Sequence, residues 1–492
     1  MVASIWQIPT TSFILSPLFG IVNVKDAPYN AAGDGIEDDY AAIQAALTYA
    51  AGANLALYFP PGTYRLATAG LNIADYNNFV IFGAGKYLSV IKRDAADVGT
   101  VLNVLRCDNV EVANLGFDGG YDLFPGGSAN QAFTYNDCEN VIGRNLYATN
   151  FKNGGINAFV TGGTQKRNIH FIECDVDGRG VANNGINLVN TKDSGIDGCH
   201  VVGCPGAPGY GLQLKNKCDK SYIRNSYVEG CKAGIAFGND IAAEGVINSQ
   251  VSNISVYNCT NGVVTGYASH NQFTDIAIDM NDIVGWGIDL DNQSHNNNFT
   301  GVKGKNVNTG RSLIRVRSGN GNVFDVSSLQ NTTINSSILA TIDATVTNTL
   351  INIDKVYTPG FNPWDRLVDD NSGNATNVFL LGKEARTELI EIVSGAVTVT
   401  TGGVRMIRLE TEALAASDDL DNILGPAQDN SIIYLQTSAS TRDVVVRDNA
   451  VGGGNISLVG AGTFTLGSVS ATIGLMWKAN VGRWVEVSRA NI

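Results

Sequence analysis

Short runs of alternating apolar and polar residues recur along the chain between Gly155 and about Arg317. Seven of these runs start 23 to 30 residues apart, with their first aliphatic residues at Ile156, Ile186, Leu212, Ile235, Val263, Ile288 and Ile314. A unit that recurs every 20 to 50 residues or so indicates a repeat architecture, in which each unit buries its apolar face against its neighbours. The period of two within each run predicts strands and not helices.

Each repeat holds further short apolar runs, such as residues 168–176, that are separated by Gly, Asn and Asp turns. Two or three strands per repeat predict an all-β chain whose main body is a right-handed, single-stranded parallel β-helix. The Leu/Asn consensus of leucine-rich repeats is absent, and a propeller blade needs about 40 residues or more. Cys174, Cys204, Cys231 and Cys259 end an apolar run in four successive coils. We expect these thiols to stack, reduced, inside the coil.

A short amphipathic helix precedes the first strands. Asp38 or Asp39 can cap its N-terminus. One face of this helix carries Ile43, Ala46, Leu47 and Ala50. We expect the helix to cover the open apolar end of the β-helix.

The sequence predicts four segments. Residues 1–52 form a lead-in and the capping helix, and residues 53–354 form the β-helix. Residues 355–376 break the repeat with Pro, Gly and polar residues and are expected to be a linker. Residues 377–492 alternate strongly between apolar and polar positions, with turn residues every 8 to 12 positions or so. This pattern predicts a C-terminal antiparallel β-sandwich or jelly-roll domain.

Composition narrows the possible partners. The 492 residues are 44% hydrophobic and carry a formal charge of −13, with a pI near 4.8. Such a chain is a poor match for nucleic acid or anionic lipid. No apolar run reaches membrane-spanning length, and the N-terminus lacks the pattern of a secretory signal. We therefore expect no membrane association and folding in a reducing cytoplasm. The eight Cys and four His show no ligand spacing, so neither a metal nor another cofactor is predicted.

Two stretches resemble a known family. Residues 24–47, with GDGIEDDYAAIQAAL, and residues 57–66, LYFPPGTYRL, resemble the opening of pectate-lyase-superfamily β-helices, which are common in phage tailspikes and capsule depolymerases. Segments 413–423, 442–460 and 474–489 resemble a module found at the ends of phage tail and spike proteins. These resemblances imply a virion protein, folded in the host cytoplasm. They also imply a homotrimer that binds a bacterial surface polysaccharide and meets other tail proteins through its N-terminus.

Alternation places two rows of side chains on the outer face of the first strand in each repeat. The first row is Asn157, Asn187, Gln213, Ala236, Val264, Asp289 and Arg315, and the second is Phe159, Val189, Lys215, Gly238, Gly266, Asp291 and Arg317. Amides and charges in line suit an extended polar glycan. The small residues of the fourth and fifth repeats leave a hollow of a size for a sugar ring.

Carboxylates near this hollow are the candidate catalytic groups, because glycoside hydrolysis generally uses two of them. Asp289 and Asp291 share a strand and a face, with Cβ atoms about 6 to 7 Å apart. Asp240 and Glu244 lie in the turn after the fourth repeat, and Asp177 lies in the turn leading to the second. The alternative for each carboxylate is an ordinary solvated turn or edge residue.

The candidate substrate-binding residues are Gln213, Lys215, Tyr267, Trp286 and Arg315. Tyr267 and Trp286 offer aromatic faces on which a sugar can stack. The alternative for Trp286 is packing between coils. Arg315, like its neighbour Arg317, can also simply pair with the carboxylates one strand away.

These patterns predict a tailspike-like depolymerase that cleaves a bacterial capsule, exopolysaccharide or O-antigen by carboxylate-pair hydrolysis. The acidic motifs of polygalacturonases do not occur before the first strands. Their absence favours a first alternative, a non-catalytic receptor-binding or structural virion protein on the same fold. A second alternative is a lyase acting on a glycan that contains uronic acid, for which Lys215, Tyr267, His270 or Arg315 could serve as the base.

Overall fold

The computed structural model describes residues 20–94, 99–123, 131–161, 163–238, 245–280, 285–291, 293–306, 311–330, 340–353, 356–357, 368–370, 378–381, 387–398, 405–424, 432–439, 441–460, 462–468 and 471–490. It contains a parallel β-solenoid of about 12 turns, as the repeat predicts. The chain divides into two compact units, residues 1–322 and 323–492. Among the described residues, no helix is long and apolar enough to cross a membrane.

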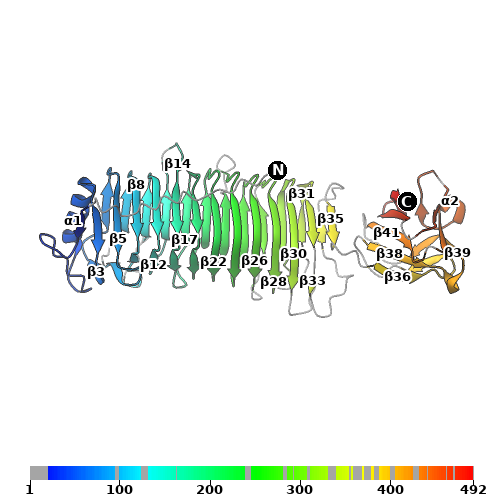
Figure 1. The fold of residues 1–492 in the computed structure, drawn as a ribbon, viewed down its shortest axis with the longest axis horizontal. Coiled ribbons are helices and arrows are strands. Elements are labelled where there is room, and N and C mark those ends of the chain that lie inside the picture. Colours follow the sequence, from blue (N-terminus) through cyan, green and yellow to red (C-terminus); the bar gives the residue numbers. More distant parts are fainter. Residues whose placement is uncertain are drawn as a thin grey trace. The chain divides into compact units, whose positions relative to one another are not determined.

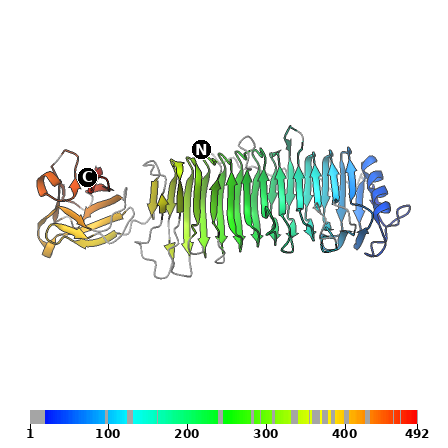
Figure 2. The same ribbon diagram turned by 180° about the vertical axis from the view of Figure 1, so that it is seen from behind.

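The first unit stacks its strands side by side in long parallel sheets (Figure 1; Figure 2). One sheet holds the first strand of each turn: β4 (Leu71–Ala74), β7 (Thr100–Leu105), β10 (Gln131–Asn136), β13 (Gly154–Phe159), β17 (Asn184–Val189), β21 (Tyr210–Lys215), β23 (Ala233–Gly238), β25 (Asn261–Gly266), β27 (Ile288–Asp291) and β29 (Ile314–Asn320). We call this sheet the first sheet, and its solvent side the first face.

A second sheet holds the other strands of the turns: β1 (Ile21–Asn23), β2 (Ala56–Phe59), β3 (Gly62–Leu66), β5 (Phe79–Gly83), β6 (Ser89–Arg93), β8 (Asp108–Ala113), β9 (Gly116–Asp118), β11 (Glu139–Arg144), β12 (Tyr147–Thr149), β15 (Ile169–Ile172), β16 (Asp175–Asp177), β19 (Gly195–Asp197), β20 (His200–Val202), β22 (Tyr222–Glu229), β24 (Gln250–Tyr257), β26 (Gln272–Asp279) and β28 (Asn298–Lys305). A small edge pair is formed by β14 (Lys166–Arg167) and β18 (Thr191–Lys192).

The register predicted for the first sheet is confirmed strand by strand. The first aliphatic residue of each run pairs with that of the next run, from Ile156↔Ile186 to Ile288↔Ile314. Every one of these side chains is fully buried. A slip of one residue would turn this whole apolar row toward solvent. Burial of the row therefore fixes which residues share the first face.

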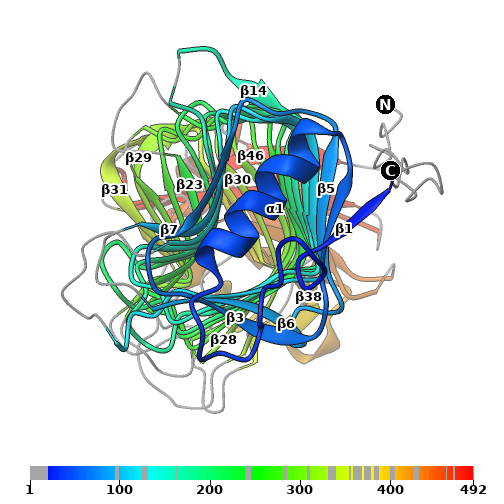
Figure 3. The same ribbon diagram turned by 90° about the vertical axis from the view of Figure 1, so that its left-hand side faces the viewer.

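The predicted capping helix is α1 (Tyr40–Gly52), which lies across the end of the stack (Figure 3). It buries Ile43, Ala46, Leu47 and Ala50, as expected. Asp39 occupies the N-cap position, yet its side chain makes no capping bond. Its carboxylate accepts hydrogen bonds from the backbone of Ala32 at 2.6 Å and of Gly33 at 3.1 Å, and so fastens the lead-in to the helix start.

Polar side chains stack inside the turn between the first-sheet strand and the next strand. Each accepts a hydrogen bond from the backbone N–H of the equivalent residue one turn earlier, in the order Ser194 (from Ile169), Ser221, Ser249, Asn271, Asn297 and Asn322. All six are at most 1% exposed. Because a buried N–H without an acceptor is costly, this ladder satisfies backbone groups that the turn would otherwise leave unpaired.

The cysteine ladder differs from the prediction in one member. All eight cysteines are buried and free. Cys204, Cys231 and Cys259 do occupy one column, as the pairing of β20, β22 and β24 requires. Cys174 instead stacks with Cys199 of the next coil, at a corner one strand earlier in the coil than the column of the other three, because Asp175 pairs with His200. The apolar run that ends at Cys174 stops one strand earlier in its coil than the other three runs do.

The second unit begins with the parallel strands β30 (Val323–Gln330), β31 (Ala340–Thr347), β32 (Leu350–Ile353), β33 (Val356–Tyr357), β34 (Val368–Asp370) and β35 (Val378–Leu381). Three smaller sheets follow. They are built from β36 (Thr387–Glu391), β38 (Arg405–Glu410), β41 (Ile432–Thr437), β45 (Thr472–Lys478), β46 (Arg483–Ala490) and β43 (Ile456–Ser457); from β37 (Ala396–Thr398) and β40 (Asn422–Leu424); and from β39 (Ser417–Leu420), β42 (Asp443–Arg447) and β44 (Thr463–Leu466). Two short helical turns, η2 (Glu412–Leu414) and α2 (Asn449–Gly452), lie among them.

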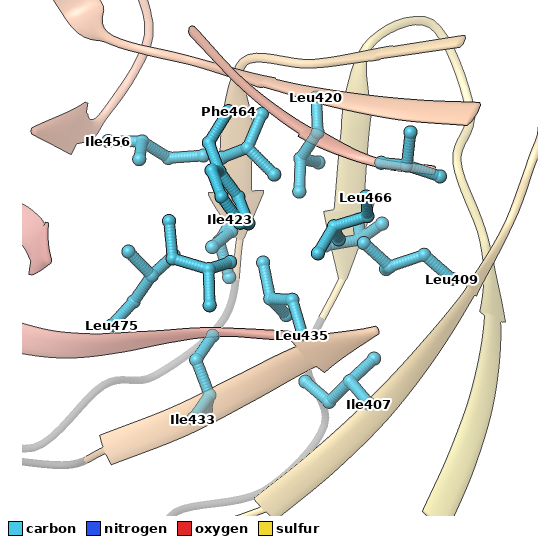
Figure 4. Close-up of a cluster of buried hydrophobic side chains, with 14 of the residues drawn as sticks. Ile407, Leu409, Leu420, Ile423, Ile433, Leu435, Ile456, Phe464, Leu466 and Leu475 are labelled. Atoms are coloured by element: carbon cyan, nitrogen blue, oxygen red, sulfur yellow. The ribbon is translucent and has the colours of Figure 1, made fainter. Parts of the chain in front are cut away.

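The predicted antiparallel strands are present in this C-terminal part, in the pairs β41–β45, β45–β46 and β42–β44. The pairs β36–β38, β38–β41 and β39–β42 are parallel, which the sequence did not predict. Aliphatic residues such as Ile407, Leu435 and Leu466 fill the core between the sheets (Figure 4). Alternation alone indicates that a strand has one buried face, but it does not indicate the direction of the neighbouring strand.

The polar ladder predicts a position-dependent loss of stability. The Asn297 side chain accepts from Asn271 and donates to the Ala268 carbonyl at 2.8 Å and to Asn322 at 3.1 Å. Asn297→Ala leaves these buried groups unpaired, and we expect a loss of about 2 to 4 kcal/mol in the free energy of unfolding. Urea denaturation measures the loss. The exposed neighbour Asn298→Ala is the control, and an equal effect of both variants would contradict the ladder's role.

Candidate functional site

A hollow of about 250 Å³ opens on the first face across strands β21, β23, β25 and β27. Its lining comprises Pro208, Tyr210, Gln213, Lys215, Lys232, Ala233, Ala236, Phe237, Gly238, Asn261, Val264, Thr265, Gly266, Asp289, Asp291 and Arg317. All of these residues belong to the first unit. The hollow therefore lies where the sequence predicts small residues between two charged rungs.

The floor of the hollow depends on glycine. Lys215, Gly238, Gly266 and Asp291 occupy equivalent positions of four adjacent strands, so two glycines separate the lysine from the aspartate. Gly238 has a φ of +95°, and a Cβ atom there would lie 1.7 Å from the carbonyl oxygen of Gly266. Any larger residue at Gly238 would clash with the next strand. The glycine pair thus keeps this part of the row free of side chains.

One end of the hollow holds two carboxylates on a single arginine. Arg317 donates to both oxygens of Asp289, at 3.1 and 2.6 Å, and to Asp291 at 2.7 Å. Asp289 is 5% exposed, whereas Asp291 is only partly covered. The sequence-based alternative, in which an arginine pairs with both carboxylates one strand away, is therefore what Arg317 does.

Burial raises the pKa of Asp289, because the charged carboxylate loses water there, and the charge of Arg317 opposes this rise. Burial is the larger of the two effects, so the pKa of Asp289 lies above its ordinary value. Asp291 lies two residues along the same strand and is more accessible to solvent. The two carboxyl groups therefore differ in environment although they share one face and one arginine.

The first outward row is less accessible than its pattern suggests. Asn157, Asn187 and Gln213 are at most 4% exposed, and Asn187 donates to Asn157 at 2.8 Å. These amides form a ladder along the face. Gln213 remains at the edge of the hollow and lines it.

Several predicted site residues lie outside this lining. The ring of Trp286 is covered by the guanidinium groups of Arg315, at 4.7 Å, and Arg311, at 5.0 Å from the ring centre. Trp286 thus packs against cations. Tyr267 lies in the turn after β25, with a φ of +52°. None of Trp286, Arg315 and Tyr267 lines the hollow.

The other predicted carboxylates are also separate from the hollow or not described. Asp177 belongs to β16 in the second sheet, and it accepts a hydrogen bond from the backbone N–H of Arg179 at 2.9 Å. It does not line the hollow. Asp240 and Glu244 lie outside the described residues. Asp289 and Asp291 are thus the predicted carboxylates that the structure brings together.

Residues that were not predicted from the sequence also line the hollow, among them Pro208, Tyr210, Lys232 and Asn261. Pro208 and Lys232 lie in the turns that lead into β21 and β23, and Tyr210 and Asn261 are the first residues of β21 and β25. A usable signal existed, because Tyr210 and Asn261 each stand directly before the glycine that precedes a repeat start. Asn261 also accepts a hydrogen bond from the backbone of Trp286 at 2.9 Å, which ties neighbouring turns together. Within the described residues, no group of three or more His, Cys, Asp or Glu is placed to hold a metal ion.

Comparison with known proteins identifies the class of the solenoid. Residues 21–264 match the family described as rhamnogalacturonase A/epimerase, pectate lyase-like. This segment therefore belongs to a pectate lyase-like β-solenoid family, as the opening motif implies. The match includes β21 and β23 of the hollow and ends within β25, before the strand that carries Asp289 and Asp291.

The individual proteins that resemble this chain match it either over a short segment or at low sequence identity. The chain is 38% identical over 103 residues to mannuronan C5-epimerase AlgE6 of Azotobacter vinelandii, which is 19% of this chain and 11% of the epimerase. Pre-mature bacteriophage phi29 gene product 12 has 16% identity and a TM-score of 0.53, over 82% of this chain and 63% of its own. The Dettilon tailspike protein gp208 has 15% identity and a TM-score of 0.50, over 94% and 76%.

These comparisons fix the fold and leave the activity open. The chain spans about a tenth of the curated epimerase and less than two thirds of the phi29 protein. At 15 to 16% identity the two phage structures show a shared fold alone. Function must therefore be argued from the residues of the hollow.

The shared arginine predicts a pH-dependent defect. Arg317→Met leaves Asp289 buried without its counter-charge, and we expect a loss of about 3 kcal/mol in unfolding free energy at pH 7. The pKa of Asp289 then rises further, so the folded state binds a proton more readily than the unfolded state. The defect should shrink as the pH falls toward the ordinary range of Asp. Thermal unfolding from pH 4 to 8 measures this trend.

The double variant Arg317→Met/Asp289→Asn is the control, since it has no buried charge at this position. We expect its stability deficit to stay constant over the same pH range. A single variant whose deficit does not change with pH would show that the arginine acts by packing alone.

Proposed function

We propose that this protein is a phage tailspike-like protein that binds and cleaves a bacterial surface polysaccharide. The observation that carries the proposal is the hollow on the first face, where two carboxylates of unlike environment stand beside a glycine floor. The pectate lyase-like family and the tailspike fold neighbours support this assignment. Mannuronan, the polymer named for the epimerase relative, is itself a polysaccharide.

The two carboxylates suit general acid–base work on a glycosidic bond. Asp289 is buried with a raised pKa, which favours the protonated form that donates to the leaving oxygen. Asp291 is more accessible, so it is the group that activates water or attacks the sugar carbon. Proton donation by Asp289 and proton acceptance or attack by Asp291 are the two roles that a pair of carboxyl groups takes in glycoside hydrolysis. Arg317 holds both groups in line along the strand.

A non-catalytic, glycan-binding virion protein is the second candidate. The ion pairs favour it, because the charge of Arg317 stabilises the ionised form of Asp289 and so opposes proton donation by that group. In this case the Asp–Arg group holds the shape of the hollow, while the lining residues Gln213, Asn261 and Lys215 contact the glycan. The two candidates differ in whether bound polysaccharide is cut.

Activity is tested by spotting purified protein on lawns of capsulated bacteria and measuring released reducing ends. We expect wild type to form haloes, and Asp289→Asn and Asp291→Asn each to lower the rate by about 100-fold or more, because acid–base groups contribute that much. Reducing ends without the ultraviolet absorbance of an unsaturated uronate indicate hydrolysis. That absorbance would instead indicate a lyase.

Two control variants sharpen this test. Asp275→Asn changes an exposed carboxylate on β26, away from the first face, and should leave the rate unchanged. Asp177→Asn tests the remaining described candidate. Wild-type binding to the bacteria without any cleavage would contradict the enzymatic proposal and support the binding protein.

The tailspike analogy also predicts a homotrimer that attaches to other tail proteins. Light scattering coupled to size exclusion measures the mass, and we expect three times the chain mass of 52.0 kDa. A stable monomer would argue against the tailspike assignment but would not affect the carboxylate test.

A further inference from the structure

The hollow is electrically asymmetric along its glycine row. Lys215 stands at one end of the row and Asp291 at the other, with Gly238 and Gly266 between them. With about 4.8 Å between strands, the two end residues are about 14 Å apart at the backbone. Both side chains can therefore reach toward a ring seated on the glycines from opposite sides.

The charged side chains at the two ends of the glycine row differ in whether they have an ion-pair partner. At the acidic end, Arg317 pairs with Asp289 and Asp291. Within the described part of the chain, Lys215 has no carboxylate within ion-pair distance, and the same holds for Lys232 on the lining. The described lining thus carries three cationic and two anionic side chains, in a protein whose formal charge is −13.

A half-buried lysine at the edge of a hollow has lost part of its hydration. An anionic group of a ligand can compensate for this lost hydration. The attraction between the lysine ammonium and that anion is stronger there than on the open surface, because less water screens it. Elsewhere on the solenoid, Lys192 pairs with Asp219 and Lys305 pairs with Asp279, in each case an aspartate of the neighbouring coil. Lys215 instead has Gly238 beside it on the next strand of the first sheet.

We infer that Lys215 binds the carboxylate of an acidic sugar whose ring lies over Gly238 and Gly266. The inference rests on the proposed function and names its substrate class, a polysaccharide that contains sugar acids. The bond to be cut then faces Asp291 and Asp289, on the side of the ring opposite the carboxylate. Lys215 is thus a specificity residue, and it takes no part in proton transfer.

Lysine protection tests this inference without any need for turnover. Trace acetylation followed by mass spectrometry gives the reaction rate of each lysine, with sodium glucuronate as the probe and glucose in matched sodium chloride as its neutral counterpart. At about four times its Kd, glucuronate should slow acetylation of Lys215 about fivefold, because the free fraction falls as 1/(1 + [L]/Kd). Lys303, exposed on β28, is the control and should not change.

Protection of Lys215 by glucuronate and not by glucose supports the inference. Equal protection by both sugars, or no protection up to molar glucuronate, overturns it. The variant Asp289→Asn/Asp291→Asn should keep the protection, which separates this result from the fate of the cleavage proposal. Conversely, cleavage of a neutral polysaccharide with unchanged KM in Lys215→Met would leave the enzymatic proposal standing and remove the charge preference.

Discussion

Stacking in register is the constraint on which the rest of this structure depends. In a parallel solenoid each strand obtains its hydrogen bonds from the strands before and after it, so every position of a turn lies beside its equivalents. Burial of the aliphatic row from Ile156 to Ile314 fixes that alignment. The ladders, the capped end and the hollow all follow from which residues the alignment brings together.

The same stacking has opposite consequences inside and outside the coil. Inside, a polar residue can be repeated cheaply, because each Ser or Asn accepts from the turn before it. Outside, repetition would give a continuous row of like side chains. The first face departs from such repetition at Gly238 and Gly266, where the row loses its side chains and a hollow forms. A site on a solenoid is thus a local break in its repeat.

Arg317 affects both the stability and the chemistry of this hollow. A buried carboxylate such as Asp289 needs a partner, and the arginine supplies it at the cost of favouring the ionised form. Catalysis would require a proton on that carboxyl group during part of the cycle. A substrate anion at Lys215 would not compete with this ion pair, because two glycine rungs separate the two charges.

The sequence by itself determined the solenoid, its capping helix, the register of the first sheet and the small-residue gap beside Asp289 and Asp291. These features follow from two repeats in the order of apolar and polar residues, one of two residues along a strand and one of about one coil along the chain. Both repeats can be read directly from the sequence. Tertiary structure decided what periodicity does not encode: that Cys174 stacks with Cys199, that Arg315 and Arg311 cover Trp286, and that turn residues such as Lys232 reach the hollow. Turns vary in length from coil to coil, so their side chains have no period from which their neighbours can be predicted.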